Sequence, residues 1–319
     1  MDKSFRKYIT LPVVEFIFFF TFAFVFWLSG ESALFPARIF IYLAFFIPGG
    51  MILYALLPEG KKIIGRKTTF LAVCLILFFG LGVLGRINLQ LEGLFFAIFT
   101  GLSMPVGLHY FVIGHFLVAK ILGPIVLNRA WCGWACWTMM VLDYLPYKKS
   151  SGRLPSGYGL LRYLHFAISL GMVMLFWKLL GYRIEDRNWP LVGWYWFLIG
   201  NAFYFTSSII MAVIFKDNRA FCKYACPLTV FFRLSGVFAL LKIKGDKDTC
   251  QDCQECAEAC PMDIRIPEYT KAGKRVLSSE CTMCLDCIKA CPHKALEVSV
   301  GFDTGGKDNL NERKPLTKE

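Results

Sequence analysis

The sequence predicts a mainly α-helical membrane protein with about six transmembrane helices, followed by a small α+β domain. Three observations lead to this fold class. Hydrophobic residues make up 56% and aromatic residues 16% of the 319 residues, which is too apolar for an ordinary soluble protein. Several windows of about 18 or more residues are almost free of charge, the length that crosses a bilayer. Finally, twelve of the thirteen cysteines fall into four short groups, two of them in the polar C-terminal part.

The predicted spans follow the uncharged windows. They cover residues 11–29, 36–57, 69–85, 95–121, 161–181 and 193–215. The fourth is irregular, because the apolar stretch 94–127 would form a helix of about 50 Å against a hydrocarbon core of about 30 Å. We expect this stretch to be broken or kinked at its helix-breaking residues. These are Gly101, Pro105, Gly107, Gly123 and Pro124.

The basic residues favour one orientation. If the N-terminus is cytosolic, the inner loops carry twelve Lys and Arg and the outer loops carry four, in agreement with the positive-inside rule. The inner residues are Lys3, Arg6, Lys7, Lys61, Lys62, Arg66, Lys67, Arg129, Lys148, Lys149, Arg153 and Arg162, and the outer ones are Arg38, Arg86, Arg183 and Arg187. We therefore predict a multi-pass protein of the cytoplasmic (inner) membrane whose N-terminus and C-terminal domain are cytosolic. The net charge of +12 belongs to membrane loops, so no nucleic-acid partner is expected.

Eight cysteines form two copies of one run near the C-terminus. The runs are Cys250-x2-Cys253-x2-Cys256-x3-Cys260-Pro261 and Cys281-x2-Cys284-x2-Cys287-x3-Cys291-Pro292. Bacterial ferredoxins use this run to bind two [4Fe–4S] clusters, and the fourth cysteine of each run ligates the other cluster. The predicted ligand sets are Cys250, Cys253, Cys256 and Cys291 for the first cluster and Cys281, Cys284, Cys287 and Cys260 for the second. Structural zinc also uses C-x2-C pairs, but its four ligands per site do not account for two such runs.

These runs give a prediction of the domain organisation. A transmembrane domain is expected over residues 1–245, a bacterial-type 2[4Fe–4S] ferredoxin domain over 246–300 and a flexible tail over 301–319. Residues 228–242 are apolar but too short to cross a membrane, and Arg233 interrupts them. We expect them to form an interfacial amphipathic helix that leads into the ferredoxin domain.

The other two cysteine groups form an internal repeat with an offset of 90 residues. The segments Asn128-Arg129-Ala130-Trp131-Cys132-Gly133-Trp134-Ala135-Cys136 and Asn218-Arg219-Ala220-Phe221-Cys222-Lys223-Tyr224-Ala225-Cys226 agree at six of nine positions. Cysteines four residues apart on a helix project from one face, so two such helices that meet would present four thiolates. We predict that Cys132, Cys136, Cys222 and Cys226 form a third iron–sulfur cluster or a metal site. Copper, zinc and a reversible dithiol pair are the alternative chemistries, and packing cysteines kept from a duplication are the non-functional explanation.

This combination of motifs resembles the NapH/NosR-type polyferredoxins. The resemblance is carried by WCGWAC in a multispan chain, by FCKYACPL and by the two ferredoxin runs, over roughly residues 95–300. It implies a membrane protein that carries electrons from the quinone pool through iron–sulfur clusters. The C-x3-C-P motifs of the family map onto Cys132/Cys136 and Cys222/Cys226. Trp137 stands in place of the first proline, and two N-terminal spans are added to the four-span pattern.

The function predicted from these features is electron transfer. We expect a membrane-anchored iron–sulfur subunit of an oxidoreductase complex, passing electrons between the quinone pool and a separate redox protein. His109, His115 and His165 are the candidate quinone-site residues, because intramembrane ionisable groups are usually functional and quinol oxidation releases protons. Haem ligation and ordinary core packing are the alternatives for these histidines. The alternative function is a metal-handling or assembly oxidoreductase of the cytochrome-oxidase accessory type, whose C-x3-C pairs act on copper.

Overall fold

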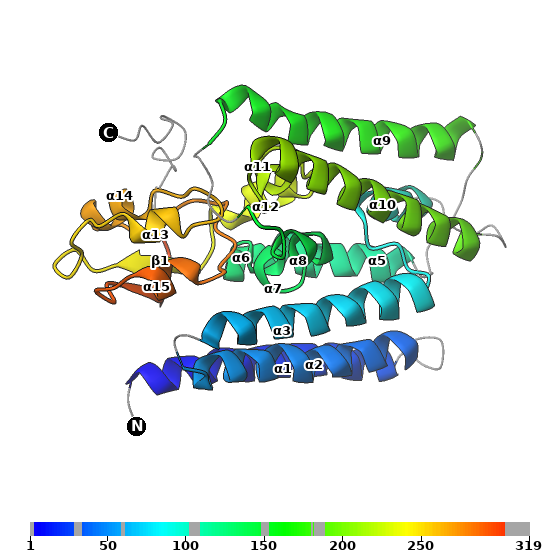
Figure 1. Ribbon diagram of the computed structural model, residues 1–319. Helices are drawn as coiled ribbons and strands as arrows, with labels where there is room; N and C mark the ends of the chain where they lie inside the picture. The colour runs from blue at the N-terminus through cyan, green and yellow to red at the C-terminus, as the bar shows by residue number, and fades with distance from the viewer. Residues whose placement is uncertain are drawn as a thin grey trace. The chain divides into compact units, whose positions relative to one another are not determined.

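The computed structural model describes residues 3–28, 34–58, 61–101, 109–147, 153–179, 181 and 189–303. Within these residues the chain is mainly helical, with one two-stranded sheet near the C-terminal end (Figure 1). The chain divides into two compact units. One comprises Met1–Ile87 and Trp134–Met140, and the other comprises Asn88–Gly133 and Val141–Glu319.

The first unit is built from N-terminal helices. They are α1 (Lys3–Leu28), α2 (Leu34–Leu56) and α3 (Lys62–Leu75), which continues as the π-helical segment η3 (Ile76–Leu84). Helix α2 packs against both α1 and α3. Gly50 permits the close approach of α2 to α3, because a Cβ at this position would overlap the Thr69 side chain. Small residues at helix crossings are typical of membrane proteins, in which packing rather than hydrophobic burial holds helices together.

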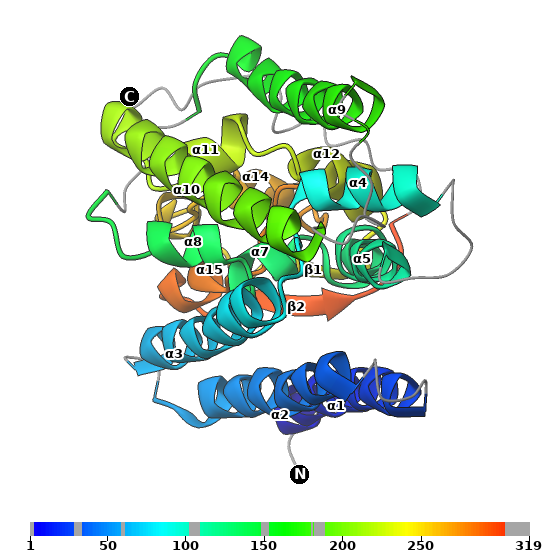
Figure 2. The same cartoon turned by 90° about the vertical axis from the view of Figure 1, so that its right-hand side faces the viewer.

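The second unit contains the remaining apolar helices. They are α4 (Leu91–Gly101), α5 (His109–Phe116) with η4 (Leu117–Leu122) and α6 (Gly123–Leu127), α9 (Leu161–Leu179) after the 3-10 turn η5 (Ser156–Leu160), and α10 (Trp189–Phe215). Helix α4 packs against α5 and α9 (Figure 2). The short helices are α7 (Ala130–Trp134), α8 (Trp137–Leu142), α11 (Ala220–Tyr224) and α12 (Thr229–Gly236). Helix α12 packs against α6, η4 and α9 and so joins the membrane segments to the C-terminal module.

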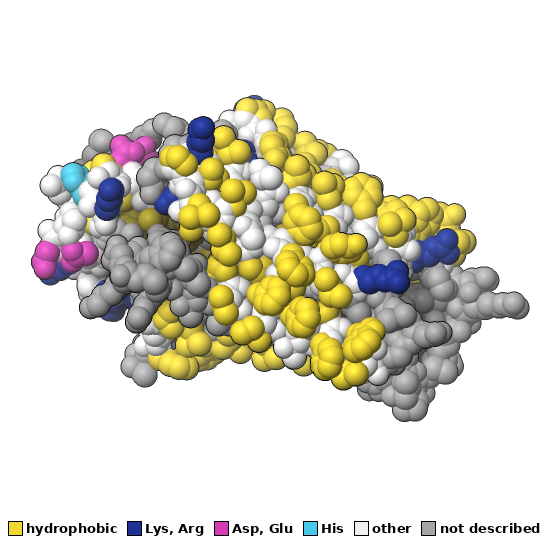
Figure 3. Space-filling view, turned by 90° about the horizontal axis from the view of Figure 1, so that it is seen from below, with side chains coloured by type: hydrophobic (Ala, Val, Ile, Leu, Met, Phe, Trp, Pro, Cys, Tyr) yellow, Lys and Arg dark blue, Asp and Glu magenta, His cyan; other side chains and the backbone are white. Residues whose placement is uncertain are grey.

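Four helical segments among the described residues are long and apolar enough to cross a membrane. They are Arg38–Leu56, Lys62–Leu84, Gly157–Leu179 and Leu191–Phe215, and they match the second, third, fifth and sixth predicted spans. Large hydrophobic side chains such as Phe45, Ile168 and Ile199 are exposed on them. Figure 3 shows hydrophobic side chains over much of the helical surface. Apolar patches of this extent are stable in lipid rather than in water. The apolar part of α1, Glu15–Val25, is shorter than a span.

The fourth predicted span is not one continuous helix. Helix α4 ends at Gly101 and α5 begins at His109. The break was predicted from the glycines and prolines of this stretch, of which Pro105 and Gly107 lie outside the described residues. Helix α4 is therefore a short helix of 11 residues that does not cross a membrane by itself.

Gly123 and Pro124 lie where the π-helical segment η4 ends and α6 begins, and Pro124 stands in the first turn of α6. One local prediction was wrong. The helix expected over 228–242 is shorter, since α12 covers only Thr229–Gly236 and Leu241 already belongs to a strand.

The C-terminal module is a small α+β unit. Strand β1 (Leu241–Gly245) pairs antiparallel with β2 (Leu296–Val300), with Leu241 opposite Val300 and Gly245 opposite Leu296. Between the strands lie α13 (Glu255–Glu258), α14 (Ile266–Lys271) and α15 (Asp286–Ala290). Ile243, Ile264 and Tyr269 are buried in its core. The predicted fold class is confirmed, and four helices among the described residues meet the length and hydropathy of a span. Residues 304–319 of the predicted tail lie outside the description.

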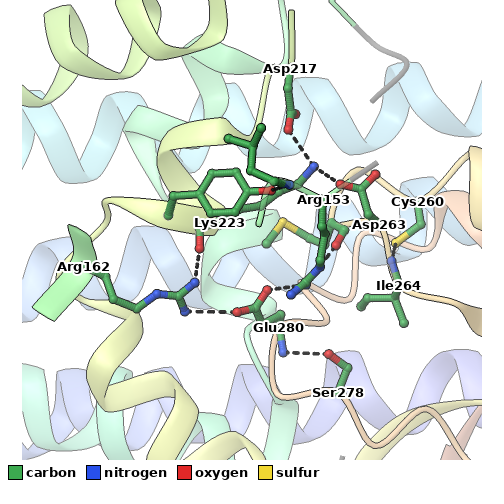
Figure 4. A network of polar contacts seen from close by, with 12 residues as sticks. Arg153, Arg162, Asp217, Lys223, Cys260, Asp263, Ile264, Ser278 and Glu280 are labelled. Atoms are coloured by element: carbon green, nitrogen blue, oxygen red, sulfur yellow. Dashed lines mark hydrogen bonds and ion pairs between the residues drawn. The ribbon is translucent and has the colours of Figure 1, made fainter. Parts of the chain in front are cut away.

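A buried carboxylate, Glu280, fastens this module to the helices of its own unit (Figure 4). Glu280 immediately precedes the second cysteine run and forms ion pairs with Arg153 and with Arg162, whose Nη1 lies 3.0 Å from Oε1. Burial alone would raise the pKa of Glu280, but the surrounding arginines, Arg153 first among them, outweigh it and lower the pKa to about 2. Glu280 therefore stays ionised and holds two arginines from the loop before α9 and from α9 itself.

A second buried ion, Lys223, joins the second C-x3-C motif to the C-terminal module. Its Nζ lies 2.7 Å from the Asp217 carboxylate and also pairs with Asp263, which lies three residues after Cys260. The Lys223 carbonyl oxygen accepts a hydrogen bond from Arg162. The two buried clusters thus share Arg162, and together they set the position of both cysteine runs relative to the helices of this unit (Figure 4).

We predict that Glu280→Gln lowers the free energy of unfolding by about 3–5 kcal/mol, because it leaves two buried arginines without their carboxylate. Thermal unfolding of the detergent-solubilised protein measures this effect. The matched control is Glu268→Gln, which removes a partly exposed carboxylate 3.2 Å from Arg265. A surface pair of this kind contributes about 0–1 kcal/mol. Equal losses in the two variants would show that the Glu280 network does not anchor the module.

Candidate functional site

The eight cysteines of the two C-terminal runs line two cavities. Cys260, Cys281, Cys284 and Cys287 line one of about 360 Å³. Cys250, Cys253, Cys256 and Cys291 line another of about 340 Å³. Each set combines three cysteines of one run with the last cysteine of the other, which is the grouping that crossed ligation requires. The repeated cysteine grouping suits two copies of one cofactor.

The thiols in these cavities are difficult to ionise on their own. Burial, followed by the charges of Cys291 and Cys250, raises the pKa of Cys256 to about 12. Burial and then Cys284 raise the pKa of Cys287 well above its usual range. Thiolates in such a setting need a bound cation, as a metal centre provides. Among the described residues, no three His, Cys, Asp or Glu side chains converge on a point that would hold a single metal ion. Each cavity instead presents four thiols, three from one run and one from the other, which is the ligand set of an iron–sulfur cluster.

The backbone around the two cavities repeats the same conformation. Three non-glycine residues in each half have a positive φ at matching positions, which turns the chain so that the thiols face inward. They are Asp252, Gln254 and Asp263 in one half and Met283, Leu285 and Lys294 in the other. Backbone N–H groups also donate to sulfur at matching positions, from Ile264 to Cys260 Sγ at 3.5 Å and from Ala295 to Cys291 Sγ at 3.3 Å. Such strain, of order 1 kcal/mol or more per residue, is typical of functional loops.

The first C-x3-C motif contacts the second cysteine run directly. The backbone N–H of Arg129 donates to the Cys281 carbonyl at 3.2 Å, and Asn128 Nδ2 donates to the Ser278 carbonyl at 3.2 Å. A Cβ on Gly133 would overlap the Thr282 carbonyl oxygen, so only glycine permits this approach. The motif and the cluster-binding loop are therefore in backbone contact.

Arg129 is electrostatically coupled to three of the four motif cysteines and to a carboxylate. Burial alone would lower the pKa of Arg129, but the influence of Cys132, followed by Glu280, Cys226 and Cys222, outweighs it and raises the pKa. Cys132, Cys222 and Cys226 lie in the second unit, whereas Cys136 belongs to the first.

Two of the predicted histidines pack against these motifs in matching ways. His115 makes an edge contact with Trp131 at 5.5 Å, and His165 contacts Phe221 at 6.2 Å, measured between ring centroids. Trp131 and Phe221 each precede the first cysteine of a motif. His165 Nδ1 also lies 2.9 Å from the Ala225 carbonyl, next to Cys226.

His109 begins α5, but its side chain lies outside the described residues. Haem ligation by His109 and a second histidine therefore stays a prediction.

The sequence-based prediction missed several functional candidates, including Glu92, Lys223 and Glu280. Glu92 was detectable as the only carboxylate within the apolar stretch 91–127. Lys223 and Glu280 carried no such signal, because their contacts with Asp263 and Arg162 join segments 40 and 118 residues apart.

Two family models match the chain. The first, described as a 4Fe-4S dicluster domain, matches residues 242–292. The second, described as a 4Fe-4S binding domain, matches residues 108–153 and 194–244, which contain the two C-x3-C motifs. No solved structure matches the chain.

Several known proteins are similar in sequence. The ferredoxin-type protein NapH of Haemophilus influenzae is 25% identical over 193 residues, covering 56% of this chain and 65% of its own length. The regulatory protein NosR of Stutzerimonas stutzeri is 28% identical over 103 residues, or 32% of this chain and 12% of its own. A ferredoxin of Methanothermococcus thermolithotrophicus is 34% identical over 58 residues, or 17% of this chain and 90% of its own. The chain thus spans just under two thirds of NapH. Together with the membrane helices and the cysteine-lined cavities, these matches show that the chain belongs to the NapH/NosR-type polyferredoxins.

Proposed function

We propose that the protein is a membrane-anchored electron-transfer subunit. It passes electrons between the quinone pool and a separate redox protein through iron–sulfur clusters on the cytoplasmic side of the inner membrane. The observation that carries the proposal is the contact of the first C-x3-C motif with the second cysteine run, Arg129 N–H to Cys281 O at 3.2 Å. This backbone contact joins the segment after α6 directly to the second cysteine run of the ferredoxin module. The excess of basic residues in the inner loops supports the orientation.

Within this proposal, the two cavities hold the two [4Fe–4S] clusters. Cys250, Cys253, Cys256 and Cys291 ligate one, and Cys281, Cys284, Cys287 and Cys260 ligate the other. When bound, the clusters supply reversible one-electron chemistry. The protein residues hold the thiolates in place and donate backbone N–H groups to sulfur. They also bury the cavity formed by Cys260, Cys281, Cys284 and Cys287.

The C-x3-C motifs hold a third, negatively charged iron–sulfur group in this proposal. Arg129 is only 1% exposed, and its Nε and Nη1 have no hydrogen-bond partner in the part of the chain that the structure describes. A buried guanidinium without hydrogen-bond acceptors costs free energy, and an anionic ligand bound beside Arg129 would remove this cost. The corresponding residue of the repeat, Arg219, pairs with Asp143 instead. A group bound by Cys132, Cys222 and Cys226 would supply the acceptors that Arg129 lacks.

We predict about 12 iron atoms and as many acid-labile sulfides per chain in anaerobically purified protein, four for each cluster. The Cys132→Ala/Cys222→Ala variant should retain about 8. Elemental analysis with sulfide assay makes the measurement, and Cys74→Ala, which removes the cysteine outside the four groups, is the control. About 8 in both proteins would contradict a third cluster, and copper bound in its place would favour metal handling.

We also predict that Arg129→Gln lowers the midpoint potential of the third group, because the loss of a nearby positive charge disfavours the added electron. The expected shift is at least about 59 mV, which is a tenfold change in a one-electron equilibrium. Redox titration followed by electron paramagnetic resonance measures it. The control is Arg219→Gln/Asp143→Asn, which removes a buried ion pair at the corresponding position. A similar shift in the control would mean that Arg129 has no special relation to the group.

A further inference from the structure

A polar loop is buried in the apolar part of the second unit. Asn88, Gln90 and Glu92 are 6%, 6% and 5% exposed, at the start of α4. The Ser169 hydroxyl donates to Glu92 Oε1 at 2.7 Å. Ser169 lies near the middle of the candidate span Gly157–Leu179. Glu92 is therefore held at mid-depth of a membrane helix, where a carboxylate is costly and usually functional.

Three polar atoms of this loop have no hydrogen-bond partner in the described structure. They are Asn88 Nδ2, Gln90 Oε1 and Glu92 Oε2. The Asn88 side chain is oriented by its Oδ1, which accepts from the Gln90 N–H at 2.9 Å. On α10, a Cβ at Gly200 would overlap the Gln90 side chain, so glycine leaves room for it. One donor and two acceptors, all buried, thus lack partners in one short loop.

One face of α9 connects this loop to the cysteine motifs. Arg162, His165 and Ser169 follow one another at helical spacing, three and four residues apart. His165 Nδ1 lies 2.9 Å from the Ala225 carbonyl, which can only accept, so Nδ1 carries the proton and Nε2 is free to accept one. His165 and Ser169 are one turn, or about 6 Å, apart along the axis. Ser169, which contacts Glu92, and His165, which contacts the residue before Cys226, therefore lie one turn apart on one face of α9.

We propose that the Asn88–Glu92 loop binds the head group of a quinol or quinone, with Glu92 as the proton acceptor. A hydroquinone suits the three atoms: its hydroxyls donate to Glu92 Oε2 and Gln90 Oε1, and Asn88 Nδ2 donates to a head-group oxygen. Oxidation breaks both O–H bonds. One proton converts the Glu92 carboxylate to the acid, and the other passes to His165 Nε2. The two electrons are taken up by the iron–sulfur chain of the proposed function, on which this inference rests. Quinone reduction is the reverse.

The test compares Glu92→Gln with Glu92→Asp in anaerobic nanodiscs. Menadiol or decylubiquinol is added as the electron donor, and the bleaching of iron–sulfur absorbance gives the rate. We expect both quinols to reduce the wild-type clusters. We expect Glu92→Gln to slow this reduction on the order of 10²-fold, the usual contribution of a positioned proton acceptor, and Glu92→Asp to restore part of it. Reduction by dithionite should be unchanged in both variants. Ser208→Ala is the control, since this buried hydroxyl donates within its own helix, to the Phe205 carbonyl at 2.9 Å.

Two further readouts do not depend on turnover. Redox-induced infrared difference spectra should contain a carboxylic acid band that Glu92→Gln abolishes. Binding of heptyl-hydroxyquinoline N-oxide, a quinol analogue, should weaken at least tenfold in Asn88→Ala and Glu92→Gln.

The outcomes separate the two proposals. If neither quinol reduces the wild-type clusters, the proposed function fails and the head-group site fails with it. If the wild type is reduced and Glu92→Gln is equally fast with an unchanged infrared spectrum, only the present inference is overturned. Unaltered analogue binding in both variants would show that the loop holds ordered water only, which also overturns it.

Discussion

The structure of the second unit depends on a set of buried ion pairs. Glu280 and Asp263 are carboxylates of the ferredoxin module, and each is held by cations from the membrane-proximal segments, Arg153 and Arg162 for the first and Lys223 for the second. Buried pairs seldom add much net stability, but breaking one is expensive, so they select one arrangement over others. Here the selected arrangement brings the second cysteine run against the first C-x3-C motif. An apolar contact of similar area would hold the parts together without specifying their register.

The internal repeat explains the layout of the redox site and also its asymmetry. Each motif places an aromatic residue before its first cysteine, and each of these rings contacts one histidine. The arginines, however, have diverged in their surroundings. Arg219 pairs with Asp143, whereas Arg129 is electrostatically coupled to Cys132, Glu280, Cys226 and Cys222. The two halves of the repeat thus differ in the partners of their arginines, and the proposed anionic group would be bound on the Arg129 side.

Charged residues inside the apolar helices can also be interpreted from the partners that they have. A buried polar group without a partner costs free energy, so its survival indicates a ligand or a function. Lys120, which is 4% exposed, lies 3.7 Å above the Trp131 ring, a position that offsets part of its desolvation. Among the described residues, Ser169 bonds one oxygen of Glu92 and the other oxygen lacks a partner. This difference between a partly compensated cation and an incompletely bonded carboxylate is the basis for proposing Glu92 as the proton acceptor.

The sequence by itself determined the membrane class, the cysteine runs and the repeat, because these depend on local patterns: uncharged windows and fixed cysteine spacing. The crossed grouping of Cys260 and Cys291 was predictable for the same reason, since one run repeats the other. The split of the fourth apolar stretch after Gly101 followed from its helix-breaking residues. The contacts of Glu280 with Arg162, of Lys223 with Asp263 and of Glu92 with Ser169 became known only from the tertiary structure, because the partners are separated by tens to more than a hundred residues. A long-range ion pair leaves no periodic signal in a single sequence, because its energy depends on burial and distance rather than on spacing along the chain.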